Sequence, residues 1–255
     1  MRKLTRHSVE FYHTEVGSGD VDQRRDTYRL HIAPNPGQHY HNAQIADYTP
    51  ETRAFKWQAG VRLTVVARFN TESVHGTAGF GFWNHPFDPK QRGLPRLPRA
   101  AWFFYGSPPN HIKLAQDVPG SGFKCATLDA TRWQFLALAP FALPGFVLMR
   151  IPPLYRRLWP IGQQAVGVTE APLPARLLPE THTYRIDWTT RGITFYLDDT
   201  ELLRSPFHIG GAMGFIAWVD NQYAVVTPQG NFGWGLVNVP GPQTLYIDHL
   251  SLEPL

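Results

Sequence analysis

The sequence predicts an all-β fold, a sandwich of two antiparallel sheets, and three observations support this prediction. Apolar and polar residues alternate with period two over many short segments, which is typical of half-buried strands. Glycine and proline account for 22 and 23 of the 255 residues without forming a repeat, and so many helix breakers favour short strands joined by turns. A helical period is not convincing anywhere in the chain. We expect one domain over residues 1–255, long enough to bury a sizeable core.

The clearest strand is predicted at residues 61–69, because every second residue there is apolar. Residues 183–188 alternate in the same way and precede two polar turns and two more strands, at 193–197 and 201–204, which predicts a β-meander. The buried face of the two clearest strands should consist of Val61, Leu63, Val65, Ala67, Phe69, Tyr184, Ile186 and Trp188. Further strands are predicted at 28–32, 44–48, 79–83, 101–105, 111–115, 213–220 and 245–252.

An apolar insertion, at about residues 133–175, breaks this pattern. Residues 133–149 carry no charge, and an arginine-rich segment, 150–159, follows. A transmembrane span is not expected, because a spanning helix needs about 20 apolar residues and Pro140 and Pro144 interrupt this stretch. Three interpretations stay open: an insertion that packs into the core with a helical turn or two, a lid over an apolar pocket, or a patch for peripheral contact with lipid headgroups. The groups that would sit at a headgroup boundary are Arg150, Tyr155, Arg156, Arg157 and Trp159.

Composition and charge exclude several protein classes. With 43% hydrophobic and 17% charged residues the chain is not intrinsically disordered, and the lone Cys125 excludes a disulfide scaffold. A formal net charge of +4, without a dense basic stripe interleaved with aromatics, excludes a nucleic-acid partner. Residues 1–11 contain no apolar segment of the kind found in signal peptides, so a cytoplasmic location is the default expectation.

The meander and several other segments resemble the concanavalin A-like lectin/glucanase superfamily, and most of all its glycoside hydrolase family 16 branch. The segments are His182-Thr-Tyr-Arg-Ile-Asp-Trp188, Gly192 to Leu203, the early segments 42–48 and 55–63, Gly79-Phe-Gly-Phe-Trp-Asn84 and Tyr246-Ile-Asp-His-Leu250. They occur in the family's order from about residue 28 to the C-terminus, apart from residues 133–175. The resemblance implies a curved jelly roll with a concave, glycan-binding cleft.

The chain departs from this family at the catalytic strand. The resemblance implies a strand with two glutamates and an aspartate soon after residue 84, because a retaining glycosidase needs two carboxyl groups about 5–5.5 Å apart. The matching segment is Arg99-Ala-Ala-Trp-Phe-Phe-Tyr-Gly106, and no Asp or Glu occurs between Asp88 and Asp117. We therefore expect no retaining hydrolysis by the family's mechanism. Whether the chain catalyses another reaction stays open.

Aromatic and polar residues near the predicted cleft are the candidates for ligand binding. Aromatic rings stack on the apolar faces of sugars and also form ordinary core. If Ala101, Phe103 and Tyr105 occupy the cleft face, the floor of the cleft is apolar and uncharged. The candidate ligand-binding residues are Trp83, Asn84, Trp102, Phe103, Tyr105, Trp218 and Asn221. His111 and Asp220 are the candidate catalytic groups, since an apolar environment raises the pKa of a carboxyl.

Metal binding has little support in the sequence. Asp248 lies where some members of the resembled family use an aspartate in a structural calcium site, but one carboxylate is far from the six to eight oxygens that calcium takes. His39 and His41 have a ligand-like spacing, yet they follow a turn and are expected at the surface. We expect no cofactor beyond a structural calcium ion.

Three functional classes follow from these observations. The first is a ligand-binding jelly roll that recognises a carbohydrate or glycoconjugate in its cleft. The second is a cleft remodelled for an apolar small molecule or lipid and covered by residues 133–160, as a binding protein or a non-glycosidase enzyme. The third is a protein-interaction module. The resemblance favours the first class, and the oligomeric state stays open.

Overall fold

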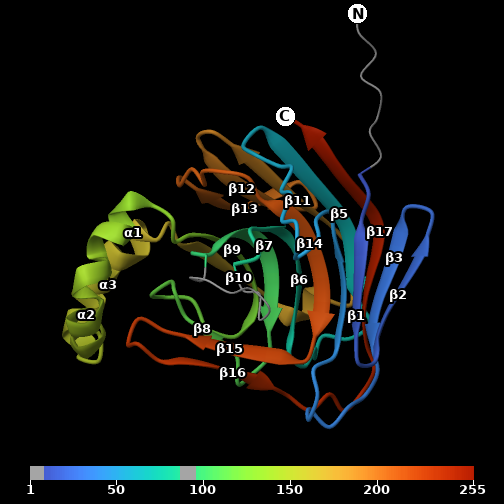
Figure 1. Ribbon diagram of the computed structural model, residues 1–255, viewed down its shortest axis with the longest axis horizontal. Coiled ribbons are helices and arrows are strands. Elements are labelled where there is room, and N and C mark those ends of the chain that lie inside the picture. The colour runs from blue at the N-terminus through green and yellow to red at the C-terminus, as the bar shows by residue number, and fades with distance from the viewer. Residues whose placement is uncertain (1–8, 87–95) are drawn as a thin grey trace, which may run out of the picture.

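The computed structural model describes residues 9–86 and 96–255 and shows two seven-stranded antiparallel sheets packed face to face (Figure 1). The first sheet has the order β1 (Tyr12–Val16), β4 (Asn42–Ala46), β14 (Gly214–Asp220), β6 (Thr77–Trp83), β7 (Arg99–Gly106), β9 (Gly122–Asp129) and β10 (Thr169–Leu173). The second has the order β13 (Thr200–Ser205), β12 (Gly192–Leu197), β11 (His182–Thr189), β5 (Val61–Phe69), β17 (Gln243–Pro254), β3 (Thr27–Ile32) and β2 (Gly19–Arg24). The predicted all-β, two-sheet jelly-roll sandwich is confirmed.

A third, smaller sheet and a group of helices stand beside the sandwich. The sheet consists of β16 (Phe232–Leu236), β15 (Gln222–Val226) and β8 (His111–Ile112). The helices are α1 (Trp133–Leu138), the 3₁₀ turn η1 (Ala139–Phe141), α2 (Ala142–Leu148) and α3 (Pro152–Ala165), and a further 3₁₀ turn, η2 (Ala175–Leu177), follows β10. Figure 1 shows the outer face of the first sheet turned toward these helices and toward the β15–β16 hairpin.

The core between the two large sheets follows the predicted alternation. All five predicted inward residues of β5 and the three of β11 are at most 3% exposed. Pairing of β11 with β12 and of β12 with β13 confirms the meander. The largest side chains that fill this core are Phe80, Phe82, Phe103, Trp188, Phe195 and Phe215.

The other predicted strands are found with shifted ends, and some strands are not predicted at all. The segment 111–115 pairs only over His111–Ile112, and the strand predicted at 44–48 lies at Asn42–Ala46. The alternation does not reveal β9, because six of its eight residues are buried and both of its faces are covered. The remaining unpredicted strands are β1, β2, β10, β15 and β16.

Residues 133–149 do not pack into the core between the two large sheets; Met149 is buried and Phe135 packs against a smaller second core. No residue of α1 or α2 is buried, and α3 buries only Ala165. The two prolines that suggested interruption stand in first turns, Pro140 in η1 and Pro144 as the third residue of α2, where a missing N–H costs no hydrogen bond within the helix. The insertion also ends earlier than predicted, since β10 belongs to the first sheet. We call residues 133–165 the helical insertion.

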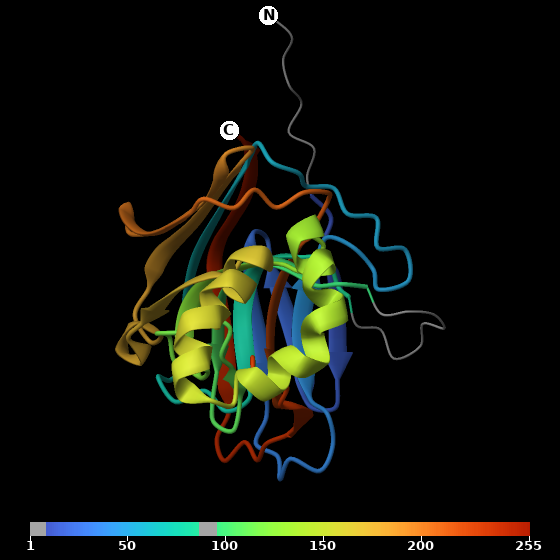
Figure 2. The same cartoon turned by 90° about the vertical axis from the view of Figure 1, so that its left-hand side faces the viewer.

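The helical insertion covers a small second core at the β9–β10 edge of the first sheet (Figure 2). This core consists of Ala115, Val118, Ala130, Val166 and Val168. No helix among the described residues is long and apolar enough to cross a membrane. Of the N-terminal segment considered for an export signal, residues 1–8 lie outside the described part of the chain.

Candidate ligand-binding face

The outer face of the first sheet presents a cluster of aromatic side chains. On β7, Ala101, Phe103 and Tyr105 point into the core, where Phe103 is fully buried. The alternate residues, Trp102 and Phe104, point outward. The predicted register, with Phe103 and Tyr105 on the ligand-binding face, is therefore wrong. Aromatic residues occupy both faces of this strand, so alternation alone does not say which face is which.

Four rings form what we call the aromatic face: Trp83, Trp102, Phe104 and Trp218. The Trp83 and Trp102 rings are stacked, with centroids 4.6 Å apart and planes inclined by 28°. Trp102 also stacks on Phe104 at 5.5 Å, and Trp218 lies 5.7 Å from Trp102. These offset-stacked arrangements are favourable for aromatic pairs.

Two glycines of β6 make room for these rings. Gly79 is the cross-strand neighbour of Phe104 and Trp218, and Gly81 is the neighbour of Trp102. A Cβ atom on Gly81 would lie 2.8 Å from the Cβ of Trp102, and one on Gly79 would lie 3.1 Å from the Trp218 indole. Glycine at both positions therefore lets the indoles lie flat across β6.

Only part of the aromatic face is open. Ile112 of β8 packs against the cluster, and Phe104 and Trp218 are buried, at 4% and 7% exposure. Trp83 and Trp102 remain partly exposed. A ligand on this face would contact the Trp83–Trp102 pair first.

Asp220 lies beside the aromatic face, on the same side of β14 as Trp218. It is buried, and its Oδ1 accepts hydrogen bonds from the Thr77 hydroxyl at 2.7 Å and from the Thr77 and Gln222 backbone N–H groups. Thr77 Oγ1 accepts in turn from the Trp218 indole N–H at 3.0 Å. Burial raises the pKa of Asp220 to about 7, against the lowering effect of these hydrogen bonds. Through Thr77, Asp220 is a positioning residue for Trp218.

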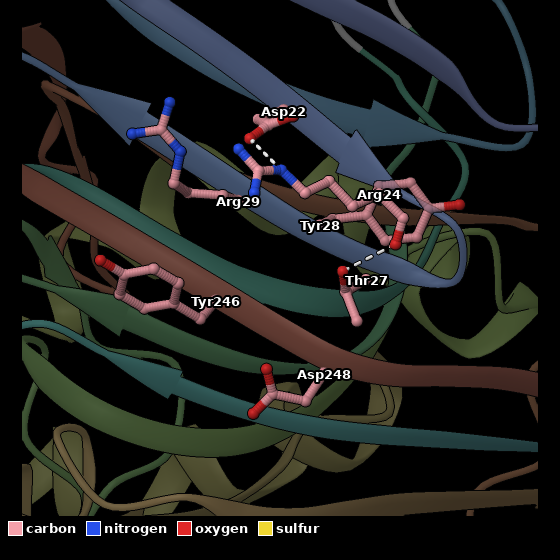
Figure 3. Close-up of a pocket in the computed structure, with 7 residues that line it drawn as sticks. All are labelled: Asp22, Arg24, Thr27, Tyr28, Arg29, Tyr246 and Asp248. Carbon is pink, nitrogen blue, oxygen red and sulfur yellow. Dashed lines mark hydrogen bonds and ion pairs between the residues drawn. The ribbon is translucent and has the colours of Figure 1, made fainter.

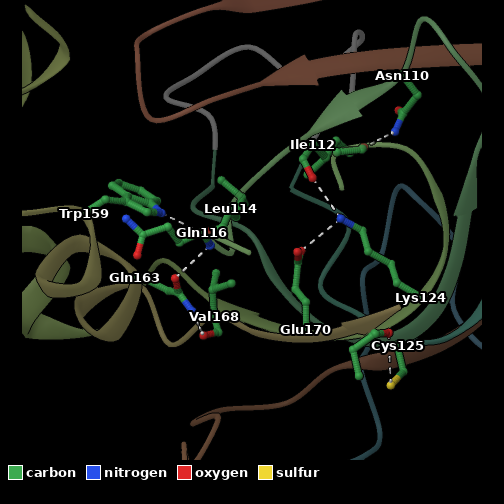
Figure 4. Close-up of polar contacts among 12 residues, drawn as sticks. Asn110, Ile112, Leu114, Gln116, Lys124, Cys125, Trp159, Gln163, Val168 and Glu170 are labelled. Atoms are coloured by element: carbon green, nitrogen blue, oxygen red, sulfur yellow. Dashed lines mark hydrogen bonds and ion pairs between the residues drawn. The ribbon is translucent and has the colours of Figure 1, made fainter. Parts of the chain in front are cut away.

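A buried ion pair lies next to the aromatic face and is absent from the sequence-based candidates (Figure 4). Lys124 Nζ is 3.1 Å from Glu170 Oε1 and donates to the Ile112 carbonyl at 2.8 Å, and both side chains are 3% exposed. Lys124 is the cross-strand neighbour of Phe104. Burial raises the pKa of Glu170, although Lys124 lowers it in part, and its second oxygen, Oε2, has no hydrogen-bond partner.

The same region fixes the helical insertion to the sandwich. The indole N–H of Trp159 in α3 donates to the Leu114 carbonyl at 2.7 Å. Gln163 Oε1 accepts from the Gln116 backbone N–H at 3.2 Å (Figure 4). Residues 112–116 therefore connect the insertion with the Lys124–Glu170 pair, which joins β9 to β10.

The two asparagines predicted to bind ligand hold loops instead. Asn84 is buried, donates to the Leu97 carbonyl at 2.9 Å and accepts from the Arg99 N–H at 2.8 Å. It therefore links the end of β6 to the start of β7. Asn221 is fully buried and accepts from the His41 N–H at 2.8 Å. Its amide donates to the His39 carbonyl and to the Asn35 side chain. The side-chain amides of both asparagines therefore form their hydrogen bonds within the protein.

The structure does not bring the two candidate catalytic groups together. His111 is exposed on β8, where it pairs with Val225 of β15. The Asp220 carboxylate bonds instead to Thr77, Gln222 and, at 3.5 Å, to the Tyr40 hydroxyl. Their roles as catalytic groups stay predictions.

Asp248 lies on β17 of the second sheet, at the surface (Figure 3). It lines a shallow hollow of about 530 Å³ over β2, β3 and β17, together with Asp22, Arg24, Arg29 and other side chains. Asp22 is paired with Arg24 at 3.2 Å. Within residues 9–86 and 96–255, no group of three or more His, Cys, Asp or Glu side chains is placed to hold a metal ion. A calcium site at Asp248 stays a prediction without further ligands.

The outward positions around the aromatic face carry few charged groups. On β7 they are Ala100, Trp102, Phe104 and Gly106. Across β4, β6, β7, β9, β10 and β14, all within the described residues, the outward carboxylates are Asp220 and Glu170, and both side chains are buried. Within these strands the outer face therefore carries no exposed carboxylate around the Trp83–Trp102 pair.

The chain is similar in fold to several proteins of solved structure. They include a pseudo β-1,3-glucanase of Mycobacterium tuberculosis (13% identity, TM-score 0.48, covering 91% of this chain and 76% of that one) and a glycosyl hydrolase family 16 protein of Mycobacterium smegmatis (13%, 0.45, 96% and 93%). A GlcNAcα1-4Gal-releasing endo-β-galactosidase of Clostridium perfringens is similar at 13% identity and a TM-score of 0.49, covering 93% of this chain and 54% of that one. No family model and no curated protein sequence matches the chain. At these identities and TM-scores, the likenesses assign neither a family nor an activity.

Proposed function

We propose that this protein binds a carbohydrate or glycoconjugate on the aromatic face. The observation that supports the proposal is the Trp83–Trp102 pair, two nearly parallel indoles that are partly exposed on the outer face of a rigid sheet. Pyranose rings present flat C–H surfaces, and these stack on aromatic planes. A rigid pair of rings loses little conformational freedom when a ligand binds.

Polar groups at the edge of the aromatic face complete the proposed site. Gln44 of β4 is the cross-strand neighbour of Trp218 and is partly exposed. Its side-chain amide offers both donors and an acceptor to sugar hydroxyls. Stacking on the indoles would then supply most of the affinity, and the amide would orient the sugar.

Binding without hydrolysis is the form of the proposal that fits the outward residues best. A retaining glycosidase needs two carboxyl groups about 5–5.5 Å apart at the substrate. Asp220 is occupied by Thr77 and Gln222, and Glu170 by Lys124, and both are buried. Neither is free to act on a sugar stacked on Trp83 and Trp102.

The alternative of an apolar small molecule beside residues 133–160 has weaker support. Two hollows, one over β2, β3 and β17 and one at residues 71–75 and 240–243, lie elsewhere, and both are open to solvent. The helical insertion meets residues 114–118 in a small packed core.

Retention on a carbohydrate array tests the proposed function. The array should include β-1,3-glucans and mucin-type O-glycans, and binding to the glycan retained most strongly should then be measured by calorimetry. The variant W83A removes a partly exposed ring that contacts one other aromatic ring of the described residues, Trp102. Loss of an aromatic anchor of this kind costs about 2 kcal/mol, roughly a 30-fold weaker affinity.

The control is W133A, which removes a 72% exposed indole from α1, outside the aromatic face. We expect W133A to bind glycans like the wild type, and both variants to unfold at the wild-type temperature within a few degrees. Equal affinity of W83A and wild type for every retained glycan would contradict the proposal. So would the absence of any retained glycan, or release of reducing ends from a bound glycan.

A further inference from the structure

The helical insertion exposes large apolar side chains on a scale that monomeric proteins rarely show. Trp133 is 72% exposed, Phe141 66%, Leu143 78% and Val147 61%. They lie on consecutive elements, α1, η1 and α2. Exposure of one such residue is common, but four within fifteen positions require an explanation.

The β15–β16 hairpin extends this surface. Phe232 and Trp234 of β16 are 65% and 78% exposed. Phe146 of α2 packs edge-on against Phe232, with ring centroids 5.6 Å apart, and Arg150 Nε donates to the Gln229 carbonyl at 3.4 Å. Figure 1 shows the tip of the hairpin beside α2. We call Trp133, Phe141, Leu143, Val147, Phe232 and Trp234 the apolar platform.

Charge is distributed unevenly around the apolar platform. Residues 130–169 contain four arginines and no carboxylate, and residues 221–247, which include the hairpin, contain no charged residue at all. The positive charge of these four arginines is as large as the formal net charge of the whole chain, +4. Arg150, Arg156 and Arg157 are exposed, and in the described part of the chain none of the three forms an ion pair.

We propose that the apolar platform and these three arginines form a docking surface for an anionic lipid bilayer. Apolar side chains flanked by cations match the boundary between acyl chains and headgroups, where the arginines would pair with lipid phosphates. The longest helix of the insertion, α3, has 14 residues, and none in the described chain is able to span a membrane. The surface lies on the bilayer and does not cross it.

The charge distribution distinguishes this occupant from a second copy of the chain. A symmetric dimer through the platform would bring the same cationic residues of both copies to one interface. Residues 130–169 and 221–247 contain no carboxylate to neutralise them, and Asp117, which acts on Tyr155 of α3, is one negative charge against the three arginines of each copy. An anionic bilayer supplies the opposite charge and the apolar layer together.

Vesicle co-sedimentation of the full chain tests this docking surface. We expect binding to vesicles of phosphatidylcholine mixed with phosphatidylglycerol, weaker binding to phosphatidylcholine alone, and loss of affinity at high salt. The variant R156Q/R157Q should bind the anionic vesicles about 30-fold more weakly, because each cation near such a surface is worth roughly a factor of five. The variant L143S/V147S should lose binding to both kinds of vesicle.

Two controls separate this surface from charge in general and from the aromatic face. R176Q/R191Q removes two exposed arginines outside the insertion, with the same change of net charge, and should bind like the wild type. W83A should also bind vesicles like the wild type, so failure of glycan binding and failure of membrane docking are separate results. Wild-type protein that stays in the supernatant with anionic vesicles would overturn the proposal. Equal weakening in R176Q/R191Q would do so too, as would a dimer that L143S/V147S dissociates in the absence of any vesicle binding.

Discussion

Breaking the Lys124–Glu170 pair from either side should be strongly destabilising. Both side chains are 3% exposed, and Glu170 Oε2 already lacks a hydrogen-bond partner. Removing one member of a buried pair leaves the other as an uncompensated charge, which costs about 3–5 kcal/mol. Methionine in K124M fills much of the lysine's volume, and E170Q keeps the glutamate's shape, so the lost charge is the main change in each variant. For a chain of this size we expect the melting temperature to fall by about 10 °C.

The pH dependence of the two variants should differ, because their remaining charges differ. Burial raises the pKa of Glu170, and Lys124 opposes this effect, so K124M should raise the folded-state pKa further. A carboxyl with a raised folded-state pKa binds more protons in the folded than in the unfolded chain. The stability of K124M should therefore increase as the pH falls from 8 toward 5. Acid should not rescue E170Q, because this variant has lost the carboxyl group that takes up the proton.

Denaturant unfolding at pH 8 and pH 5 measures these effects, with the double variant K124M/E170L as the control. Replacing a buried pair by apolar residues is often neutral or stabilising, so the double variant should be more stable than either single one. A loss below about 1 kcal/mol in both single variants would refute the reasoning, since that is the range of a solvated surface pair. Identical stability–pH profiles for K124M and E170Q would refute the conclusion that the pH dependence of K124M comes from the Glu170 carboxyl.

Three further variants test other parts of the structure. Because burial raises the pKa of Asp220 to about 7 from its ordinary 3.8, its contribution to stability should decrease by about 3 kcal/mol as the pH rises from 4 to 7; D220N should remove that slope from a series of urea unfolding curves. N221A removes a fully buried amide and leaves the His41 N–H without its acceptor; it should cost about 3 kcal/mol in chemical denaturation, and a loss under 1 kcal/mol would show that the loop it holds adapts. G79A would place a Cβ 2.2 Å from the Phe103 carbonyl oxygen and should lower the melting temperature by at least about 4 °C, whereas an unchanged melting curve would contradict the close approach of β6 and β7.

The sequence predicts those strands whose two faces differ in environment. On β5 and β11 the outward residues are polar apart from Val66 and include Arg62, Arg68, Arg185 and Asp187, so polarity marks the solvent side. On β7 and β9 the outward side is covered by the aromatic face, β8 and the helical insertion, so both faces carry apolar residues. The alternation is lost there, and the register of β7 is predicted the wrong way round.

The candidate site was predicted only in part. Trp83, Trp102 and Trp218 do gather on one surface, because their strands β6, β7 and β14 are neighbours in the sheet. Lys124 and Glu170 are 46 residues apart in the chain, and each stands alone in an apolar segment. Only the pairing of β9 with β10 brings them together. Asn84 and Asn221 carry amides of the kind that bind ligands, but these amides form hydrogen bonds to the backbone of nearby loops. The sequence alone does not distinguish the two roles.

The stacking of Trp83 on Trp102 has an optical consequence. Two indoles 4.6 Å apart share their excited states, so their ultraviolet transitions couple and produce paired circular-dichroism bands of opposite sign. Removing either ring abolishes this coupling. A molecule that binds on the pair shifts the energy of the coupled transitions and the fluorescence of the two indoles. The protein thus contains its own chromophore for detecting occupancy of the surface, without any attached label.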